Sequence, residues 1–148
     1  MSATFPELNL DKQLCFSLYA ASRQVTRLYQ PLLKRHDITY PQYIVLLILW
    51  QNDGLTVKDI GHQSQLKSNT LTPLLKRLEQ NELVVRKRAK DDERQCHIFL
   101  TDKGKVLERE CACIPREMMD QTEMSVEKLL QLKALLDEFL HLQEKHGE

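Results

Sequence analysis

Four cysteines are the side chains of this sequence most suited to covalent chemistry: Cys15, Cys96, Cys111 and Cys113. No two of them form a Cys-x-x-Cys pair, and on a helix Cys111 and Cys113 would point about 200° apart. A zinc site is therefore not expected. The five histidines show no metal-ligand spacing either, so no metal or other cofactor is predicted. In a reducing compartment each cysteine is expected to be a thiol, either reactive or packed as a small core residue.

A second chemical signal is the uneven distribution of charge. The net charge of the 148 residues is zero, but residues 67–90 contain seven cations and two anions. That segment carries +5, so the remainder carries −5. A local basic segment is either a solvated face or a surface that binds the phosphates of a nucleic acid.

Composition limits the class of protein. The chain is 42% hydrophobic and 28% charged, which is ordinary for a globular domain, and its length fits a single one. No apolar run approaches the roughly 20 residues of a membrane span. The first residues lack the basic and apolar regions of a signal peptide, so a cytoplasmic protein without membrane contact is predicted.

Two helices are expected to position the N-terminal cysteine. Apolar residues at helical spacing predict a first helix over about 10–36, and Pro31 should bend it or end one half of it. The segment from Pro41 to Gln51 is apolar on nearly all sides, which predicts a buried helix that starts at Pro41. Asn52, Asp53 and Gly54 should end that helix.

The basic segment lies in a helix-turn-helix pattern. Thr56 can cap a short helix that runs to about His62. A second helix is predicted from Lys67 to Gln80, with four leucines on one face and polar groups on the other. Small polar side chains at the start of such a helix can reach base edges, while its free amides favour phosphate. The polar face consists of Ser68, Asn69, Thr70, Thr72, Lys76 and Arg77.

Two short strands should follow, over about 83–88 and 95–100, as a two-stranded wing that bears Arg86, Arg88 and Arg94. An arginine at the wing tip can enter a minor groove, and Asp92 can orient the guanidinium of Arg94. Further helices are predicted to start after Thr101 and Ser125. The predicted fold is mainly α with a small two-stranded β wing: a winged helix-turn-helix over about 54–100 within a single chain of 1–148. The apolar stripes of the helices at about 10–36 and 102–146 predict dimerisation with a second copy.

These residues together resemble the MarR family of bacterial winged-helix regulators, and within it the organic-hydroperoxide-sensing branch. The resemblance covers nearly the whole chain. It is carried by the segments 13–23, 38–43, 70–79, 91–94 and 100–104, which read QLCFSLYAASR, ITYPQY, TLTPLLKRLE, DDER and LTDKG. The chain departs from the expected pattern at Lys67 and Asn69, where close relatives should have an acidic residue and a glycine. It also has Cys111 and Cys113, where single-cysteine members have no thiol.

The resemblance implies a role for each of these groups. Cys15 would be the reactive thiolate, Tyr29 and Tyr40 of the other subunit would hydrogen-bond it, and Tyr19 would lie in the same pocket. Arg94, supported by Asp92, would read the minor groove. Ser68, Thr70 and Arg77 would contact DNA from the recognition helix, and Asn69, Thr72, Lys76, Arg86 and Arg88 complete the predicted DNA surface.

A thiol ordinarily titrates near pKa ~8.5, so a reactive thiolate needs stabilising partners. Tyrosine hydroxyls can provide them. Oxidation would give a sulfenic acid, then a disulfide with a low-molecular-weight thiol or a second cysteine, for which Cys111 and Cys113 are the candidates. Cys96 is expected to be a structural thiol. The added bulk would shift the two recognition helices of the dimer.

The predicted function is a homodimeric repressor, not an enzyme, that binds a pseudo-palindromic site in double-stranded DNA and is released when an organic hydroperoxide oxidises Cys15. Half-sites would lie about one helical turn apart. One alternative is a repressor released by a non-covalent aromatic ligand. Others are a sensor of hypochlorite or electrophiles and, from another class, a thiol peroxidase that uses Cys15 as nucleophile.

Overall fold

The computed structural model describes residues 5–88, 90–91 and 94–147. These fall into two compact units, residues 1–112 and residues 113–148. The division lies inside the segment 102–146 that was predicted to dimerise. Each unit is described by itself below.

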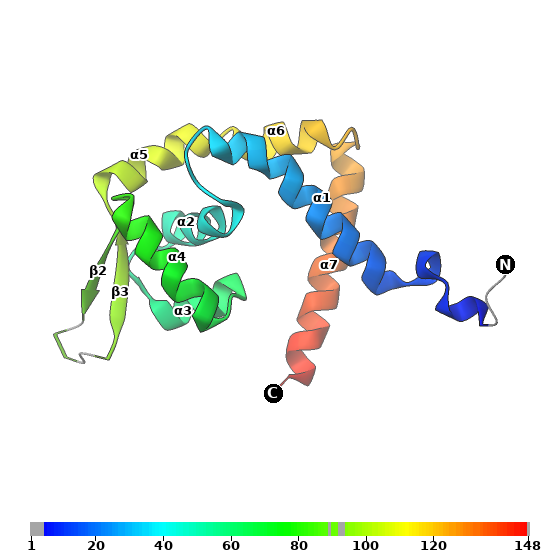
Figure 1. The fold of residues 1–148 in the computed structure, drawn as a ribbon, viewed down its shortest axis with the longest axis horizontal. Helices are drawn as coiled ribbons and strands as arrows, with labels where there is room; N and C mark the ends of the chain where they lie inside the picture. The colour runs from blue at the N-terminus through cyan, green and yellow to red at the C-terminus, as the bar shows by residue number, and fades with distance from the viewer. Residues whose placement is uncertain (1–4, 89, 92–93, 148) are drawn as a thin grey trace. The chain divides into compact units, whose positions relative to one another are not determined.

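The first unit combines helices with a small sheet (Figure 1). Two short 3-10 turns, Pro6–Leu8 and Leu10–Lys12, come first. The helices are α1 (Leu14–Lys34), α2 (Tyr40–Gln51), α3 (Val57–Ser64), α4 (Ser68–Gln80) and α5 (Asp102–Cys111), and the strands are β1 (Leu55–Thr56), β2 (Val84–Arg88) and β3 (Cys96–Leu100). The predicted helix-turn-helix followed by a β ribbon is present.

Helix α1 is shorter at both ends than the helix predicted over about 10–36. It begins at Leu14, after the 3-10 turns, and continues through Pro31 to Lys34. Of the two predicted effects of Pro31, an end of the helix at that residue does not occur. Proline removes one backbone donor, but Leu32 and Leu33, which follow it, are both buried and hold the last turn against the core.

Helix α2 starts at Tyr40, one residue before the predicted start at Pro41. The reason is a capping box: the Thr39 hydroxyl accepts from the Gln42 amide at 3.4 Å, and the Gln42 side chain accepts from the Thr39 amide at 2.9 Å. The reciprocal pair fixes the first turn. Tyr43, Val45, Leu46 and Leu49 of α2 are almost fully buried, so the predicted buried helix is confirmed.

The sheet has three antiparallel strands in the order β1-β3-β2, where two were predicted. The extra strand, β1, is two residues long and pairs Leu55 with Ile98 and Thr56 with His97. No periodicity can reveal so short a strand. Asp53 anchors it, because its carboxylate accepts from the Gly54 amide at 2.9 Å and from the Leu100 amide at 2.8 Å.

The helix-turn-helix is held by capping and by a leucine face. The Thr56 hydroxyl accepts from the Asp59 amide at 3.1 Å, as predicted, although α3 extends to Ser64. Gln65 then adopts a left-handed conformation, with φ of 60°, in the turn. The face of α4 that was predicted to be apolar is buried and consists of Leu71, Leu74, Leu75 and Leu78. Its opposite face is thereby left exposed.

Helix α5 is joined to the core by a close approach at Gly104. The Thr101 hydroxyl caps α5 by accepting from the Gly104 amide at 3.0 Å, and the Trp50 indole donates to the Gly104 carbonyl at 2.9 Å. A Cβ atom at residue 104 would overlap the Leu83 carbonyl oxygen. Glycine is thus required where α5 approaches Leu83, the residue that precedes β2.

The second unit contains α6 (Ile114–Gln121) and α7 (Val126–His146). The Ser125 hydroxyl caps α7 by accepting from the Lys128 amide at 3.2 Å. Helix α7 buries none of its residues, and it exposes Val126, Leu130, Leu132, Leu135, Phe139, Leu140 and Leu142. Among the described residues, no helix is both long and apolar enough to cross a membrane.

Candidate functional site

The exposed face of α4 presents polar and basic groups. Ser68, Asn69, Thr70, Thr72, Lys76 and Arg77 are all exposed. The N-cap residue is Lys67, and its side chain makes no capping hydrogen bond. The amides of the first turn therefore keep their affinity for an anion.

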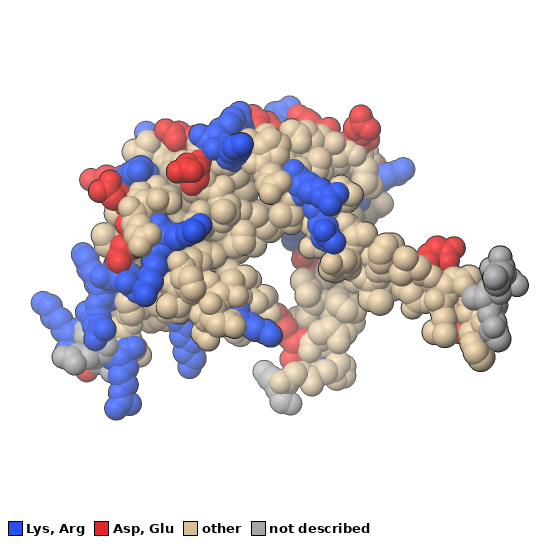
Figure 2. Space-filling model, viewed as in Figure 1, with Lys and Arg blue, Asp and Glu red and all other residues tan. Residues whose placement is uncertain are grey.

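The wing adds arginines beside this helix. Arg86, Arg88 and Arg94 line a hollow of about 550 Å³ together with Glu79 and Cys96. In Figure 2, Lys and Arg side chains gather where Figure 1 shows β2 and β3. Asp92, the predicted support of Arg94, lies outside the described residues.

The side chain of Arg86 on β2 is bound by Glu79 of α4. Its guanidinium donates to the Glu79 carboxylate at 3.2–3.4 Å, and its backbone amide donates to the same carboxylate at 3.1 Å. Hydrogen bonds from Arg86 lower the pKa of Glu79. The pair links the recognition helix to the wing, so these two elements present their cations in a fixed arrangement.

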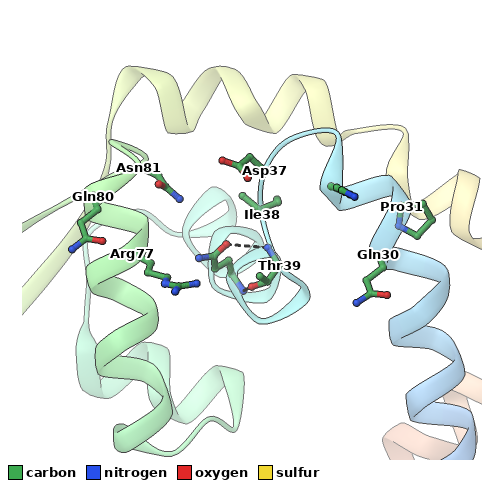
Figure 3. Close-up of a pocket in the computed structure, with 10 residues that line it drawn as sticks. Gln30, Pro31, Asp37, Ile38, Thr39, Arg77, Gln80 and Asn81 are labelled. Atoms are coloured by element: carbon green, nitrogen blue, oxygen red, sulfur yellow. Dashed lines mark hydrogen bonds between the residues drawn. The ribbon is translucent and has the colours of Figure 1, made fainter.

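Arg77 lines a different pocket from the one that the wing arginines line. A pocket of about 760 Å³ separates the end of α1 from the last turns of α4. Figure 3 shows Arg77 reaching into this pocket from α4, with Gln30 and Pro31 across from it on α1. Lys34 contributes a second cation, and Gln42 and Asn81 contribute amides.

Cys15 is an exposed thiol at the second position of α1. The N-cap residue of α1, Gln13, makes no side-chain cap, so the first-turn amides beside Cys15 can stabilise negative charge on the sulfur. Tyr19 follows one turn later, which places both side chains on one face. The Tyr19 hydroxyl accepts a hydrogen bond from Arg23 at 3.2 Å, and the Arg23 guanidinium carbon lies 5.6 Å from the centre of the Tyr19 ring.

Three tyrosines form a cluster where α1 and α2 meet. The Tyr29 ring lies 5.0 Å from that of Tyr40 and 5.7 Å from that of Tyr43, measured between centroids. Burial raises the pKa of Tyr29 and of Tyr40, and raises that of Tyr43 to about 12, with neighbouring Tyr29, Cys111 and Tyr40 adding to the last shift. At neutral pH all three hydroxyls thus remain protonated and can donate hydrogen bonds.

The cluster does not include Cys15 of the same chain. Tyr29 follows Cys15 by fourteen residues on one continuous helix, which corresponds to about 21 Å along the axis. Tyr29 and Tyr40, being in contact, are both too distant to hydrogen-bond that sulfur. The predicted thiol–tyrosine site can therefore form only if a second copy supplies the tyrosines.

The other three cysteine thiols differ in their exposure to solvent. Cys111, the last residue of α5, is 3% exposed, whereas Cys113 is exposed and Cys96 is half-buried on β3. The described residues contain no group of His, Cys, Asp and Glu side chains arranged to hold a metal ion.

Sequence reasoning missed three residues of these sites. Tyr43 is three residues after Tyr40 and Arg23 is four after Tyr19, so helical spacing could have revealed both. Glu79 could not have been found in this way, because its partner Arg86 lies on another element.

The chain is similar to known transcriptional regulators in both sequence and fold. Residues 27–110 match the family model for the transcriptional regulators SarA and Rot. The chain is 48% identical, over 92% of both sequences, to the organic hydroperoxide resistance transcriptional regulator of Bacillus subtilis. The chain belongs to the SarA/Rot family of MarR-like winged-helix transcriptional regulators. The predicted membership of the MarR family and of its organic-hydroperoxide branch is confirmed.

Solved structures of a similar protein, AbfR, show the same fold. Reduced AbfR bound to DNA, a protein of Staphylococcus epidermidis, has a TM-score of 0.79 at 36% identity, with 99% of this chain and 100% of that chain covered. The disulfide-formed AbfR has a TM-score of 0.62 at 40% identity, with 88% and 92% covered. The mainly α winged-helix fold is thus confirmed, with three strands in place of two.

Proposed function

We propose that this regulator is a homodimeric repressor that binds double-stranded DNA when Cys15 is reduced and releases it when an organic hydroperoxide oxidises Cys15. The observation that carries the proposal is an exposed cysteine at an uncapped helix start, in the same unit as a basic winged helix. The relatives support it, since one is an organic hydroperoxide resistance regulator, and another, AbfR, has solved structures of its reduced form bound to DNA and of its disulfide form.

DNA binding uses the exposed face of α4 and the wing. The side chains at the start of α4, from Ser68 to Thr72, reach base edges in a major groove, while the lysines and arginines neutralise phosphates. Arg94 reads a minor groove from the wing. Because the regulator is a dimer, its site is a pseudo-palindrome in which each recognition helix contacts one half.

The sensing site is shared between subunits. Tyr29 and Tyr40 of one chain donate hydrogen bonds to the Cys15 thiolate of the other, and their raised pKa keeps them protonated for that purpose. Oxidation removes the negative charge that they hold. Tyr40 and Tyr43 of the cluster lie on α2, and α2 packs against α3 and α4, so a change at the cluster moves the recognition helix.

Oxidation proceeds in two steps. The thiolate takes the terminal oxygen of the hydroperoxide and becomes a sulfenic acid, while the alkoxide gains a proton and leaves as an alcohol. A second thiol then displaces water from the sulfenic acid to form a disulfide. That thiol is a small cellular thiol or a cysteine of the C-terminal pair, of which exposed Cys113 is more accessible than buried Cys111.

The regulator acts in the cytoplasm and is not an enzyme: each oxidation changes the protein instead of turning over substrate. The alternative of a non-covalent aromatic effector finds less support in the structure. Of the ten residues that line the pocket between α1 and α4, Pro31 and Ile38 alone are apolar, and aromatic ligands bind in sites lined mainly by apolar groups.

The test is a titration of the reduced protein on an inverted-repeat duplex, with and without cumene hydroperoxide, for wild type, Cys15→Ser and the control Cys96→Ser. We expect wild type and Cys96→Ser to dissociate on oxidation and Cys15→Ser to remain bound. Equal dissociation of Cys15→Ser would exclude Cys15 as the sensor. Failure of all reduced proteins to bind, across operator-length inverted repeats, would exclude the DNA-binding assignment.

A further inference from the structure

The hollow between the wing and α4 has a cysteine in its wall. It has a volume of about 550 Å³ and is lined by Glu79, Arg86, Arg88, Arg94 and Cys96. Arg88 on β2 lies directly opposite Cys96 on β3. Because side chains alternate between the two faces of a strand, Arg86 shares this face with the pair. The half-buried Cys96 thiol is therefore reached from the hollow.

The hollow is positively charged. Its lining contains three arginines and one glutamate, which leaves a net charge of +2. Glu79 is bound to Arg86, whose guanidinium donates to its carboxylate at 3.2–3.4 Å, while Arg88 is the residue that lies across from Cys96. Reactive cysteines lie in partly exposed, electropositive surroundings of this kind. The hollow thus combines groups that attract anions with a nucleophile.

We propose that Cys96 is a second modification site, at which the thiol exchanges with a small disulfide that carries carboxylate groups. Arginines suit this ligand because a guanidinium can donate two parallel hydrogen bonds to a carboxylate. The cations also raise the local concentration of an anionic reagent. An uncharged disulfide gains neither advantage, so the hollow selects for negative charge on the reagent.

The exchange needs no further oxidant, because the small disulfide is itself reduced. Cys96 gives its proton to solvent, and its thiolate attacks one sulfur of the disulfide. A new S–S bond to Cys96 forms, the original S–S bond breaks, and the other half of the reagent leaves as a thiolate. Negative charge is spread over the three sulfurs in the transition state, where the guanidinium groups of the hollow stabilise it.

The adduct acts on the DNA-binding surface directly. It adds bulk and carboxylates between the wing and the recognition helix, among cations that neutralise DNA phosphates in the proposed function, so it opposes DNA binding. Cumene hydroperoxide is uncharged and is not drawn to this hollow, and Cys15 takes no part in the exchange. The reaction at Cys96 is thus independent of the sensing by Cys15, and only its effect on DNA rests on the proposed function.

The first experiment measures how fast Cys96 of the reduced full-length protein forms a mixed disulfide with two reagents. Dithiobis(nitrobenzoate) carries two carboxylates, and dithiodipyridine is uncharged. Mass spectrometry of the tryptic peptide 95–103, which contains no other cysteine, reports on Cys96 alone. The variants are Arg88→Gln and Arg88→Lys. Lys87→Gln is the matched control, because Lys87 pairs with His97 on the other face of the ribbon and lies 5.3 Å from the centre of the Phe99 ring.

The quantity compared is the ratio of the two rates, anionic over uncharged, because an effect of Arg88 on the thiol itself cancels in it. Arg88→Gln should lower this ratio about tenfold, the lower range for electrostatic attraction into a charged cleft, whereas Arg88→Lys and Lys87→Gln should stay within about threefold of wild type. The wild-type ratio should also fall as salt is added. A ratio that Arg88→Gln leaves unchanged would overturn the proposal and leave the arginines as contacts for DNA alone.

The second experiment follows DNA binding in the Cys15→Ser background. Modification of Cys96 by dithiobis(nitrobenzoate) should weaken binding to the inverted-repeat duplex at least tenfold, the effect of losing a few phosphate contacts. The Cys15→Ser/Cys96→Ser protein should keep its affinity under the same treatment, and bound duplex should protect Cys96 from the reagent. Unchanged affinity with Cys96 fully modified would overturn the proposal. Reduced protein that never binds the duplex would instead refute the proposed function, and the rate ratios would still decide whether the hollow selects anionic disulfides.

Discussion

At the scale of single residues, the same side-chain type has different chemistry because its surroundings differ. Cys15 is exposed beside uncapped amides, whereas Cys111 is buried against the tyrosine cluster. Of these two thiols, Cys15 is the one that a hydroperoxide can reach from solvent. The tyrosines are likewise suited to donate hydrogen bonds, because burial opposes their ionisation.

The raised pKa of Tyr43 gives a pH prediction. Its pKa is 10.0 in an unfolded chain and about 12 in the folded protein. The stabilisation from the neutral hydroxyl is therefore complete below pH 10 and is lost as pH rises toward 12, by roughly 2–3 kcal/mol at the end of that range. Urea unfolding from pH 9 to 12 should show this loss in wild type and a smaller one in Tyr43→Phe. Parallel curves for the two proteins would contradict the assignment.

At the scale of elements, the start of the recognition helix combines weak capping with charge. Lys67 occupies the N-cap position with extended backbone, φ of −71° and ψ of 151°, and provides no cap. Replacement by asparagine adds a capping oxygen and removes a cation. Lys67→Asn should raise the free energy of unfolding by about 0.5–1 kcal/mol, and lower the salt dependence of DNA binding by about one counterion.

Chemical denaturation and DNA titrations at several salt concentrations check both effects. Lys58→Asn on α3, which also removes a lysine but no N-cap position, is the control for the stability change. A stabilised variant with unchanged salt dependence would mean that Lys67 does not contact phosphate.

The elements also show what the sequence could and could not predict. Long amphipathic patterns and hydroxyl caps were sufficient for α4, α5 and α7, since Thr101 and Ser125 cap their helices as expected. The predicted start of α2 is one residue late, because Thr39 and Gln42 form a capping box that sets the first turn one residue before Pro41. Strand β1 was missed because tertiary pairing with β3 alone defines it.

Some parts of the candidate site can likewise be predicted from the sequence and others cannot. The position of the polar face of α4 can be predicted, because the leucines of α4 bury its opposite face. The Glu79–Arg86 link and the Tyr29–Tyr40–Tyr43 cluster required coordinates, because each joins side chains from two elements whose approach depends on tertiary packing.

At the scale of the whole molecule, the exposed apolar surface of α7 indicates an interface that a second copy of the chain covers. Leu135 is 65% exposed on a helix that buries nothing within its own chain. In the dimer, Leu135→Glu would place an unpaired carboxylate in an apolar interface, at a cost of about 2 kcal/mol or more. The dimer should dissociate at least tenfold more readily by sedimentation. A dimer unchanged by this substitution would exclude this face of α7 from the interface.

The division of the thiol site between subunits gives a second prediction. A mixed dimer of one Cys15→Ser chain and one Tyr29→Phe/Tyr40→Phe chain contains one Cys15, and its partner carries intact tyrosines. That thiol should oxidise at the wild-type rate, whereas the homodimer of the tyrosine variant should be slow. The mixed dimer, made from differently tagged chains, would react as slowly as that homodimer if each chain used its own tyrosines.

The central claim, that oxidation of Cys15 controls DNA binding, is tested most directly by measuring both quantities in one sample. Cumene hydroperoxide is titrated into the protein–DNA complex, fluorescence anisotropy gives the fraction of DNA bound, and mass spectrometry of the Cys15 peptide gives the fraction oxidised. The account predicts that DNA release follows Cys15 oxidation step for step and that Cys15→Ser stays bound throughout. Release while Cys15 is still reduced, or full oxidation of Cys15 with the DNA still bound, would contradict it.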